Sequence, residues 1–161
     1  MRRGMVLLIA MMLMVAGAIA QEAPGINRLS AEAMAAQEKT LMETARTSAT
    51  GVVGETLEKY PGSYTMLAVR AKSGVAEVHA NWDDYFFVID GAGTLVTGGT
   101  AVDPKLGEDG ETRGTRVDGG TPTPMRKGDV IHISAKVPHQ VILAPGETVT
   151  YYVVKVAVPK Q

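Results

Sequence analysis

Three histidines carry the side chains best suited to metal or proton chemistry, and each lies in a stretch with a strand-like pattern. His79 and Asn81 have the same parity, so on a strand both side chains would point to one face. Asp84 follows a turn expected at Trp82-Asp83, and His139 opens a later strand-like run. A metal site in a barrel needs imidazole and carboxylate groups that project inward from different strands. These side chains can therefore form one site only if the strands close around them.

A helix is expected before these strands. Residues 30–48 are rich in Ala, Glu, Gln and Met, and Ser30 is a suitable N-cap. The apolar residues fall on one helical face, and charged residues of both signs lie mostly elsewhere. The mixed charges favour a helix packed on its own domain over one that binds a membrane surface. Residues 56–60 are expected to add a helical turn that ends at Pro61-Gly62.

From residue 63 onward the hydrophobic period changes to that of strands. Strands are expected at residues 64–70, 75–79, 85–89, 94–97, 130–133, 140–143 and 148–158. Turn residues separate several of them, as at Asp90-Gly91, Gly98-Gly99 and Pro145-Gly146. Short strands at this spacing predict an antiparallel sandwich or barrel.

Residues 98–128 break this rhythm with many glycines, three prolines and alternating charges. A long segment of this kind in a compact domain is typically a functional loop or loosely ordered. Two interpretations stay open: a lid over one mouth of the barrel, or a surface excursion without a role. A short strand is expected within it at residues 112–117.

The first twenty residues have the pattern of a secretory signal peptide. Arg2 and Arg3 form the basic start, residues 5–17 are almost wholly apolar, and Ala18-Ile19-Ala20 is a cleavage site. The apolar run is short for a transmembrane helix, so no stable membrane anchor is expected after cleavage behind Ala20. The mature chain is expected to be periplasmic or secreted. The expected organisation is a signal peptide at 1–20, a linker and helix at 21–62, and a barrel at 63–161.

Composition narrows the class of protein. A chain of 161 residues that is 45% hydrophobic is long enough for one domain with a real core. The 16 basic and 17 acidic residues and the 5% aromatic content argue against a nucleic-acid protein. The absence of cysteine excludes disulfides, thiolate metal sites and cysteine nucleophiles. Gly91-Ala-Gly93 leads into further strand rather than into a helix, which disfavours nucleotide binding.

Two segments of the chain resemble the paired motifs of the cupin superfamily, including its type-2-like conserved barrels. In the first motif of that family, two histidines flank one residue, and a carboxylate, six residues and a glycine follow. His79, Asp84 and Gly91 match this pattern, and Asn81 replaces the second histidine. The second motif is matched by Gly128 and His139, with Ser134 and Lys136 where Pro and Gly usually stand. The resemblance covers roughly residues 64–156.

The resemblance implies an all-β fold, a double-stranded β-helix or jelly-roll-like barrel, preceded here by the amphipathic helix. It implies a divalent metal ion (Fe, Mn, Zn or Ni) with His79, Asp84 and His139 as ligands. Asn81 would be a weak ligand or a substrate contact. His132 matches no ligand position and is assigned to structure.

Three functions remain open on this basis. The first is a metal-dependent enzyme that acts on a small organic molecule by oxygenase, isomerase or lyase chemistry. The second is a non-catalytic cupin that binds a small ligand, with a degenerate or absent metal site. The third is a structural or interaction role. Residues 85–89 are apolar on both faces, so the outer face needs cover from the helix or from a second protomer. Because cupins commonly dimerise through such faces, the resemblance implies a homodimer.

Overall fold

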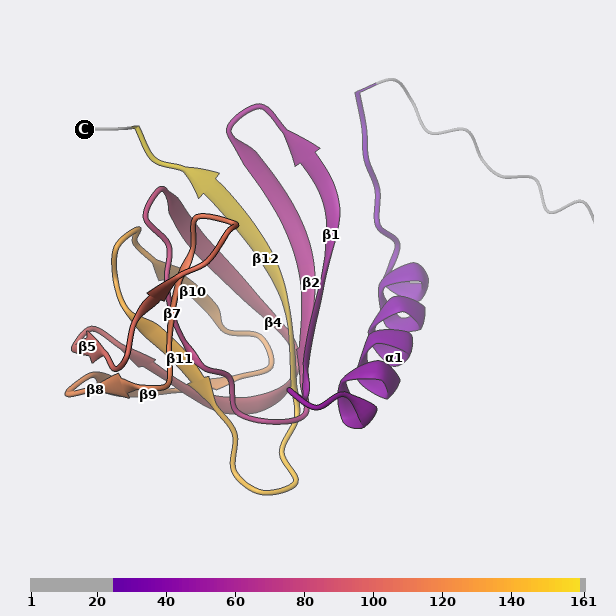
Figure 1. Ribbon diagram of the computed structural model, residues 1–161. Helices are drawn as coiled ribbons and strands as arrows, with labels where there is room; N and C mark the ends of the chain where they lie inside the picture. Colours follow the sequence, from indigo (N-terminus) through magenta and orange to yellow (C-terminus); the bar gives the residue numbers. More distant parts are fainter. Residues whose placement is uncertain (1–24, 160–161) are drawn as a thin grey trace, which may run out of the picture. The chain divides into compact units, whose positions relative to one another are not determined.

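The computed structural model describes residues 25–159 of the chain (Figure 1). Residues 25–30 contain a turn and no helix or strand, and every element lies in the unit that begins at Ala31. The signal peptide predicted at residues 1–20 lies outside the described residues. Within residues 25–159, no helix has the length and apolar character needed to cross a membrane.

One helix precedes a series of antiparallel strands (Figure 1). The helix α1 spans Ala31–Thr47, directly after Ser30, in agreement with the predicted N-terminal helix. The long strands are β1 (Val52–Tyr60), β2 (Ser63–Arg70), β4 (Trp82–Thr97), β9 (Thr121–Arg126) and β12 (Val149–Ala157). The short strands are β3 (Ala76–Val78), β5 (Thr100–Ala101), β6 (Lys105–Leu106), β7 (Thr112–Gly114), β8 (Val117–Asp118), β10 (Val130–Ile133) and β11 (His139–Ile142).

The long strand β4 organises the sheet. Its first half pairs with β12 and β10, and its second half pairs with β11 and β9, in each case antiparallel. The path through the ten-stranded sheet is β1-β2-β12-β4-β11-β3-β7-β6, and β5 and β8 form a separate ribbon. The sheet curls on itself, so the strands of its two halves face each other (Figure 1). The prediction of an all-β barrel is confirmed.

Two apolar clusters hold this arrangement together. Inside the curled sheet, a cluster that includes Phe86, Leu95 and Tyr151 is almost fully buried. On the outer face of β2, Leu67 and Val69 pack against Leu41 and Ala45 of α1. Each large side chain buried in this way stabilises the fold by about 1.5–3 kcal/mol.

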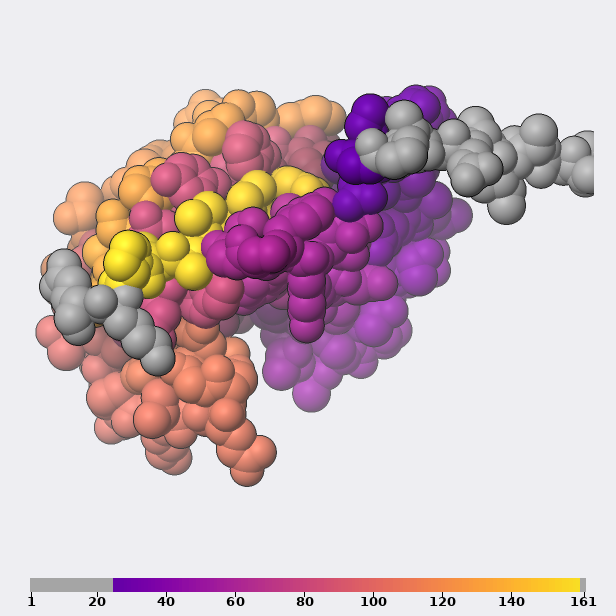
Figure 2. Space-filling view, turned by 90° about the horizontal axis from the view of Figure 1, so that it is seen from above, coloured from indigo at the N-terminus to yellow at the C-terminus, as the bar shows by residue number. Residues whose placement is uncertain are grey.

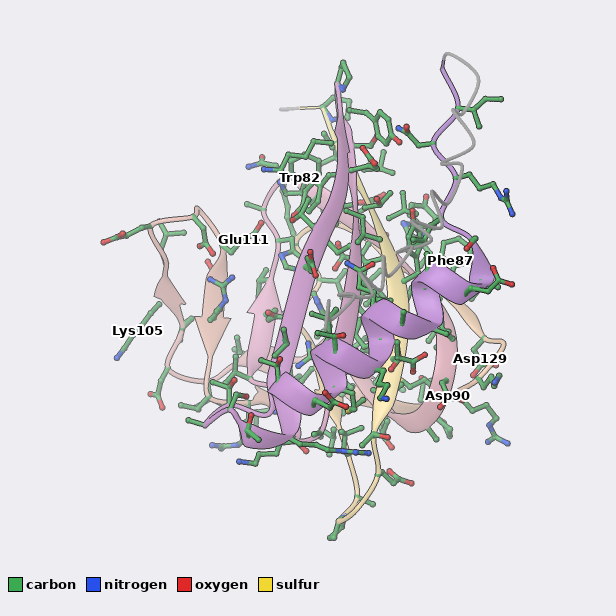
Figure 3. The ribbon with its side chains drawn as sticks, turned by 90° about the vertical axis from the view of Figure 1, so that its right-hand side faces the viewer. Trp82, Phe87, Asp90, Lys105, Glu111 and Asp129 are labelled. Carbon is green, nitrogen blue, oxygen red and sulfur yellow. The ribbon has the colours of Figure 1, made fainter. Side chains whose placement is uncertain are left out.

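The helix supplies part of the cover that the outer face of residues 85–89 was expected to need. Ile89 packs against the cluster between α1 and β2. Phe87 remains 40% exposed on the same face, beside Tyr152 at a ring separation of 6.4 Å. Figure 3 shows Phe87 near one end of the helix.

Three local predictions were wrong. Trp82-Asp83 is not a turn, because both residues belong to the start of strand β4. Residues 56–60 belong to strand β1, which forms a hairpin with β2 around Pro61-Gly62, and not to a helical turn. Most side chains of β1 are exposed and polar, so no alternation in the sequence marks it as a strand. Asp90-Gly91 is not a turn, because β4 continues through it with a register shift against β12. Gly91 has a φ of 77°, a conformation that suits glycine at a bulge.

Residues 98–128 are more regular than expected. They contain strands β5 to β9, and the predicted strand at 112–117 corresponds to β7 and the start of β8. The β6–β7 hairpin pairs with β3, directly beside the predicted site. This segment therefore forms part of the wall around His79.

Candidate functional site

Strand pairing places two of the site residues opposite each other. His139, the first residue of β11, pairs with Glu77 in the middle of β3. Side chains at directly opposed antiparallel positions lie about 5 Å apart on the same face of the sheet. His79 follows β3 by one residue and has the parity of Glu77, so it projects toward the same face. Glu77, His79 and His139 thus meet on one face of the sheet.

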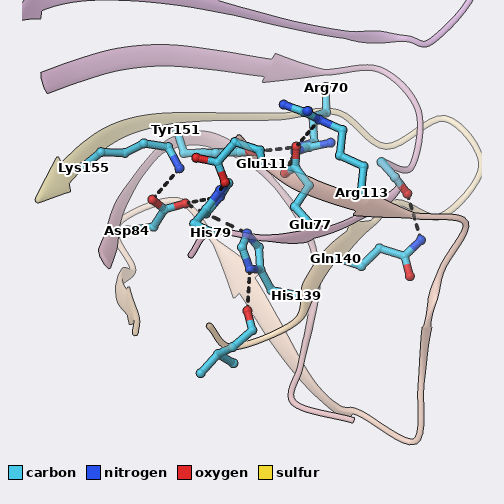
Figure 4. Close-up of polar contacts among 12 residues, drawn as sticks. Arg70, Glu77, His79, Asp84, Glu111, Arg113, His139, Gln140, Tyr151 and Lys155 are labelled. Atoms are coloured by element: carbon cyan, nitrogen blue, oxygen red, sulfur yellow. Dashed lines mark hydrogen bonds and ion pairs between the residues drawn. The ribbon is translucent and has the colours of Figure 1, made fainter. Parts of the chain in front are cut away.

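Strand β4 adds Asp84 to this group. Asp84 Oδ2 lies 3.1 Å from His79 Nε2 and 3.9 Å from His139 Nε2 (Figure 4). The rings of the two histidines are 5.0 Å apart between centroids. Asp84 and His139 are each 2% exposed and His79 is 7% exposed. The structure therefore brings together the three residues predicted as metal ligands.

His79 lies between two carboxylates. Its Nε2 faces Asp84, and its Nδ1 donates a hydrogen bond to Glu111 Oε2 at 2.5 Å. Burial alone would lower the pKa of His79, but the hydrogen bonds and charges of these carboxylates outweigh it and raise that pKa above its ordinary value. In the metal-free protein this arrangement favours the imidazolium form of His79.

His139 is in the opposite state. Burial lowers the pKa of His139, and the nearby charge of His79 lowers it further, so its neutral form is favoured. Its Nδ1 donates a hydrogen bond to the backbone carbonyl of Val137 at 3.1 Å. This bond fixes the tautomer and leaves the lone pair on Nε2. That Nε2 atom is buried and makes no hydrogen bond among the described residues.

Asp84 also forms a buried ion pair. Its Oδ1 lies 2.6 Å from Nζ of Lys155 on β12, and Lys155 is 7% exposed. Burial would raise the pKa of Asp84, but the hydrogen bond from His79 and the charge of Lys155 together lower it. Asp84 is therefore ionised, with one oxygen toward Lys155 and the other toward the histidines.

Asn81 does not join the site. Strand β3 ends at Val78, and Asn81 is exposed in the segment before β4. It lines a separate surface depression with Asp83 and Lys136, whereas Glu77 takes the place beside His79 that was expected for Asn81. The sequence contained the signal, because Glu77 has the same parity relative to His79 as Asn81 and a carboxylate is the stronger ligand.

Two arginines lie beside the carboxylate of Glu77. Arg70 is 7% exposed, and its Nε donates to the hydroxyl of Tyr151 at 2.6 Å. Its Nη2 lies 3.5 Å from Glu77 Oε2. Arg113 lies 3.9 Å from the other oxygen of Glu77. The two arginines hold the Glu77 carboxylate beside the histidines (Figure 4).

A cavity of about 680 Å³ opens onto the site. Its walls come from β1, β2, β12 and the hairpin that carries Glu111, and its aromatic lining includes Tyr64, Trp82 and Phe86. In the space-filling view, a hollow separates the magenta β1–β2 strands from the salmon segment near residue 110 (Figure 2). Burial and the charge of Asp84 raise the pKa of Tyr64 to about 12, so its hydroxyl stays protonated at neutral pH. The volume suits a small organic molecule.

The donor set fits a divalent metal ion. Glu77, His79 and His139 each offer one ligand atom, and these atoms lie within 4.8 Å of one another. Two imidazoles and one carboxylate are donors that suit first-row transition metals. The buried Nε2 of His139, with its tautomer already fixed, is the kind of orphaned atom that an ion would satisfy.

His132, the third histidine, lies outside this group. It donates to Asp83 at 3.1 Å, stacks on Tyr85 and has a side chain that is 43% exposed. These contacts tie β10 to β4, so His132 offers a matched control for the buried histidines.

Comparison with known proteins identifies the fold. The chain matches no family model and no curated protein. The cupin domain of Cnp3 from Schizosaccharomyces pombe superposes with a TM-score of 0.50 at 11% identity, covering 66% of this chain and 65% of that one. The barrel has the cupin fold.

Two further solved structures are similar at lower scores. A cupin 2 conserved barrel protein from Rhodopseudomonas palustris gives a TM-score of 0.48 at 16% identity, over 68% of this chain and 63% of that one. The polyketide cyclase RemF from Streptomyces resistomycificus gives 0.47 at 18% identity, over 67% and 68% of the two chains.

Proposed function

We propose that this cupin-fold chain binds one divalent metal ion through Glu77, His79 and His139 and holds a small organic molecule in the adjoining cavity. The observation that carries the proposal is the state of His139. Its Nε2 is buried and makes no hydrogen bond in the part of the chain that the structure describes, and its Nδ1 donates to the carbonyl of Val137. Leaving such an atom unsatisfied costs free energy, and coordination to a metal would recover it.

Asp84 stays a candidate fourth ligand through Oδ2, the oxygen that faces both histidines. Lys155 holds the other oxygen and so limits how far the short aspartate side chain can turn. Iron, manganese, zinc and nickel all remain compatible with this donor set. The ion would supply a Lewis acid or an oxygen-binding centre for oxidoreductase, isomerase or lyase chemistry. The chain itself would shape the cavity, and the protonated hydroxyl of Tyr64 would be available as a hydrogen-bond donor.

A second candidate function is a barrel that binds a small ligand without metal. It is favoured by the ion pairs of the metal-free protein, because Asp84 already pairs with Lys155 and His79 already bridges Asp84 and Glu111. Every buried carboxylate of the site therefore has a positive partner without an ion. Metal content separates the two candidates.

The experiment is elemental analysis of protein produced by export, without a histidine tag. We expect about one metal ion per chain in the parent, and a loss of that ion in His79→Ala, His139→Ala and Glu77→Ala. His132→Ala and Asn81→Ala are the controls, because each removes a comparable side chain outside the site, and both should retain the metal. Parent protein that takes up no iron, manganese, zinc or nickel would refute metal binding and favour the second candidate.

The proposal includes export. A cleavable leader at residues 1–20 would place the mature chain in the periplasm or outside the cell. Mass spectrometry of the exported protein should give a chain that begins at Gln21, and an intact leader would contradict this. Self-association is proposed as well, since Phe87 and Val130, which lie opposite each other on β4 and β10, leave apolar surface exposed. Sedimentation of the same preparation should give the mass of a homodimer.

A further inference from the structure

The β6–β7 hairpin carries the carboxylate of Glu111, which contacts His79. Strand β7 pairs with β3 so that Thr112 lies opposite Val78, which places Glu111 opposite His79 just beyond both strands. Glu111 Oε2 accepts the hydrogen bond from His79 Nδ1 at 2.5 Å, across 32 residues of sequence. The side chain of Glu111 is 15% exposed, so this contact is largely shielded from solvent.

The hairpin holds Glu111 in place from both sides. The backbone carbonyl of Glu111 accepts a hydrogen bond from Gly107 N at 2.8 Å, and Glu111 N donates to Asp109 Oδ1 at 3.1 Å. Asp109 in turn forms an ion pair with Arg113 at 2.8 Å. In Figure 3, Glu111 lies on the inner side of the hairpin, whereas Lys105 extends away from the barrel. Glu111 is therefore built into the wall of the site.

The contact determines which nitrogen of His79 is available to an ion. An imidazole that donates from Nδ1 presents Nε2 on the opposite side of the ring, and Nε2 of His79 faces the atoms of Asp84 and His139. A carboxylate that accepts from the outer nitrogen of a ligating histidine fixes its orientation and makes it a stronger ligand. His139 receives this support from a backbone carbonyl, and His79 receives it from Glu111.

We propose that Glu111 is a positioning residue that orients His79 for metal binding, an inference that rests on the proposed function. It assigns a role to the segment 98–128: the hairpin supplies the outer support of a ligand from a distant part of the chain. Glu111 acts through His79, without contact to the ion.

The first test compares Zn²⁺ dissociation constants of the full-length parent and three hairpin variants. Glu111→Ala should weaken Zn²⁺ binding by about 10–100-fold, the usual effect of removing such a partner. Glu111→Gln keeps an oxygen that accepts the hydrogen bond and should retain most of the affinity. Glu108→Ala removes an exposed carboxylate from the same hairpin, so it controls for charge alone and should bind like the parent.

The second test uses metal-free protein and does not depend on Zn²⁺ binding. The proton on Nδ1 of His79 should give a downfield, slowly exchanging nuclear magnetic resonance signal, assigned by its absence in His79→Gln. The signal should persist in Glu111→Gln and Glu108→Ala and disappear in Glu111→Ala. This signal reports the contact between His79 and residue 111 directly. General destabilisation of the hairpin would not give a signal that persists in Glu111→Gln and disappears in Glu111→Ala.

Any of three outcomes would overturn the inference. The first is a magnetic resonance signal of His79 that persists in Glu111→Ala. The others are a loss of Zn²⁺ affinity in Glu108→Ala equal to that in Glu111→Ala, or a Glu111→Gln variant that binds Zn²⁺ no better than Glu111→Ala. A parent that binds none of Zn²⁺, iron, manganese and nickel while the signal still depends on Glu111 would refute the proposed function. The same result would support Glu111 as the residue that orients His79.

Discussion

The buried ion pair between Asp84 and Lys155 makes the stability of the barrel sensitive to one charge. At 2.6 Å and an effective dielectric constant of about 20, the attraction is about 6 kcal/mol. Removing both charges from water costs several kcal/mol per ion, so the intact pair contributes little net stability. Removing one member of the pair leaves the charge of the other buried without a partner, and that burial costs free energy. Among the described residues, Lys155 has no other ion pair.

We therefore expect Asp84→Asn to lower the free energy of unfolding by about 3–5 kcal/mol. Lys155→Met should cost less, because Asp84 keeps its hydrogen bond from His79 at 3.1 Å. The double variant should lose less than the sum of the single losses, with a coupling energy of about 1–3 kcal/mol. Urea unfolding of chelator-treated protein measures the free energy of unfolding of the parent, the two single variants and the double variant. If Asp84→Asn does not fold, a folded double variant still reveals the coupling.

The exposed ion pair between Lys127 and Asp90 is the matched control. Its atoms are 3.2 Å apart, but the side chains are 71% and 59% exposed. Lys127→Met should therefore change the free energy of unfolding by no more than about 1 kcal/mol. The reasoning would be refuted if Asp84→Asn cost no more than Lys127→Met, or if the effects of the two buried substitutions simply added.

Three further predictions concern pH and backbone strain. In metal-free protein, the raised pKa of His79 should make the free energy of unfolding fall as the pH rises from about 6.5 through that pKa. The lowered pKa of His139 should make the free energy of unfolding fall as the pH drops below about 6.5. When unfolding is measured against pH, His79→Gln should lack the first dependence and His139→Gln the second. Gly91→Ala should lower the melting temperature far more than Gly146→Ala: both have positive φ, but a Cβ at residue 91 collides with a backbone carbonyl. Lys136 has a φ of 68°, so Lys136→Gly should raise the free energy of unfolding by up to about 1 kcal/mol in a urea titration; a loss would show that Lys136 is not strained.

The fold could be predicted from the sequence because the strands of the barrel interior alternate clearly. Asp84, Phe86 and Val88 share the buried face of β4, as their parity predicts. Strand β1 was missed because it lies at the sheet edge with mostly exposed polar side chains, and only its pairing with β2 identifies it. The turn at Asp90-Gly91 was misassigned because a glycine at a bulge and a glycine at a turn share the same conformational requirement.

The site was predicted in part. Parity places a partner two residues from His79 without saying on which side, and the family motif suggested Asn81 rather than Glu77. The pairing of His139 with Glu77 across β11 and β3 places Glu77 beside the two histidines, whereas Asn81 lies outside this group. Glu111, Lys155 and Arg70 could not have been found from local spacing, because their contacts with the site depend on the pairing of distant strands. Long-range register, unlike alternation, has no local signature in a single chain.

The two histidines of the site differ in a way that constrains how an ion could enter. The lowered pKa of His139 favours its neutral form, and its Nε2 makes no hydrogen bond within residues 25–159, so this half of the proposed site would need no rearrangement to accept an ion. The raised pKa of His79 favours a proton on the Nε2 atom that faces Asp84, so an ion bound at this atom would have to displace that proton. Lys155 neutralises the charge of Asp84 through their ion pair at 2.6 Å. Without an ion, Asp84 and Glu111 thus already have positively charged partners, and the same contacts hold the candidate ligand atoms close together.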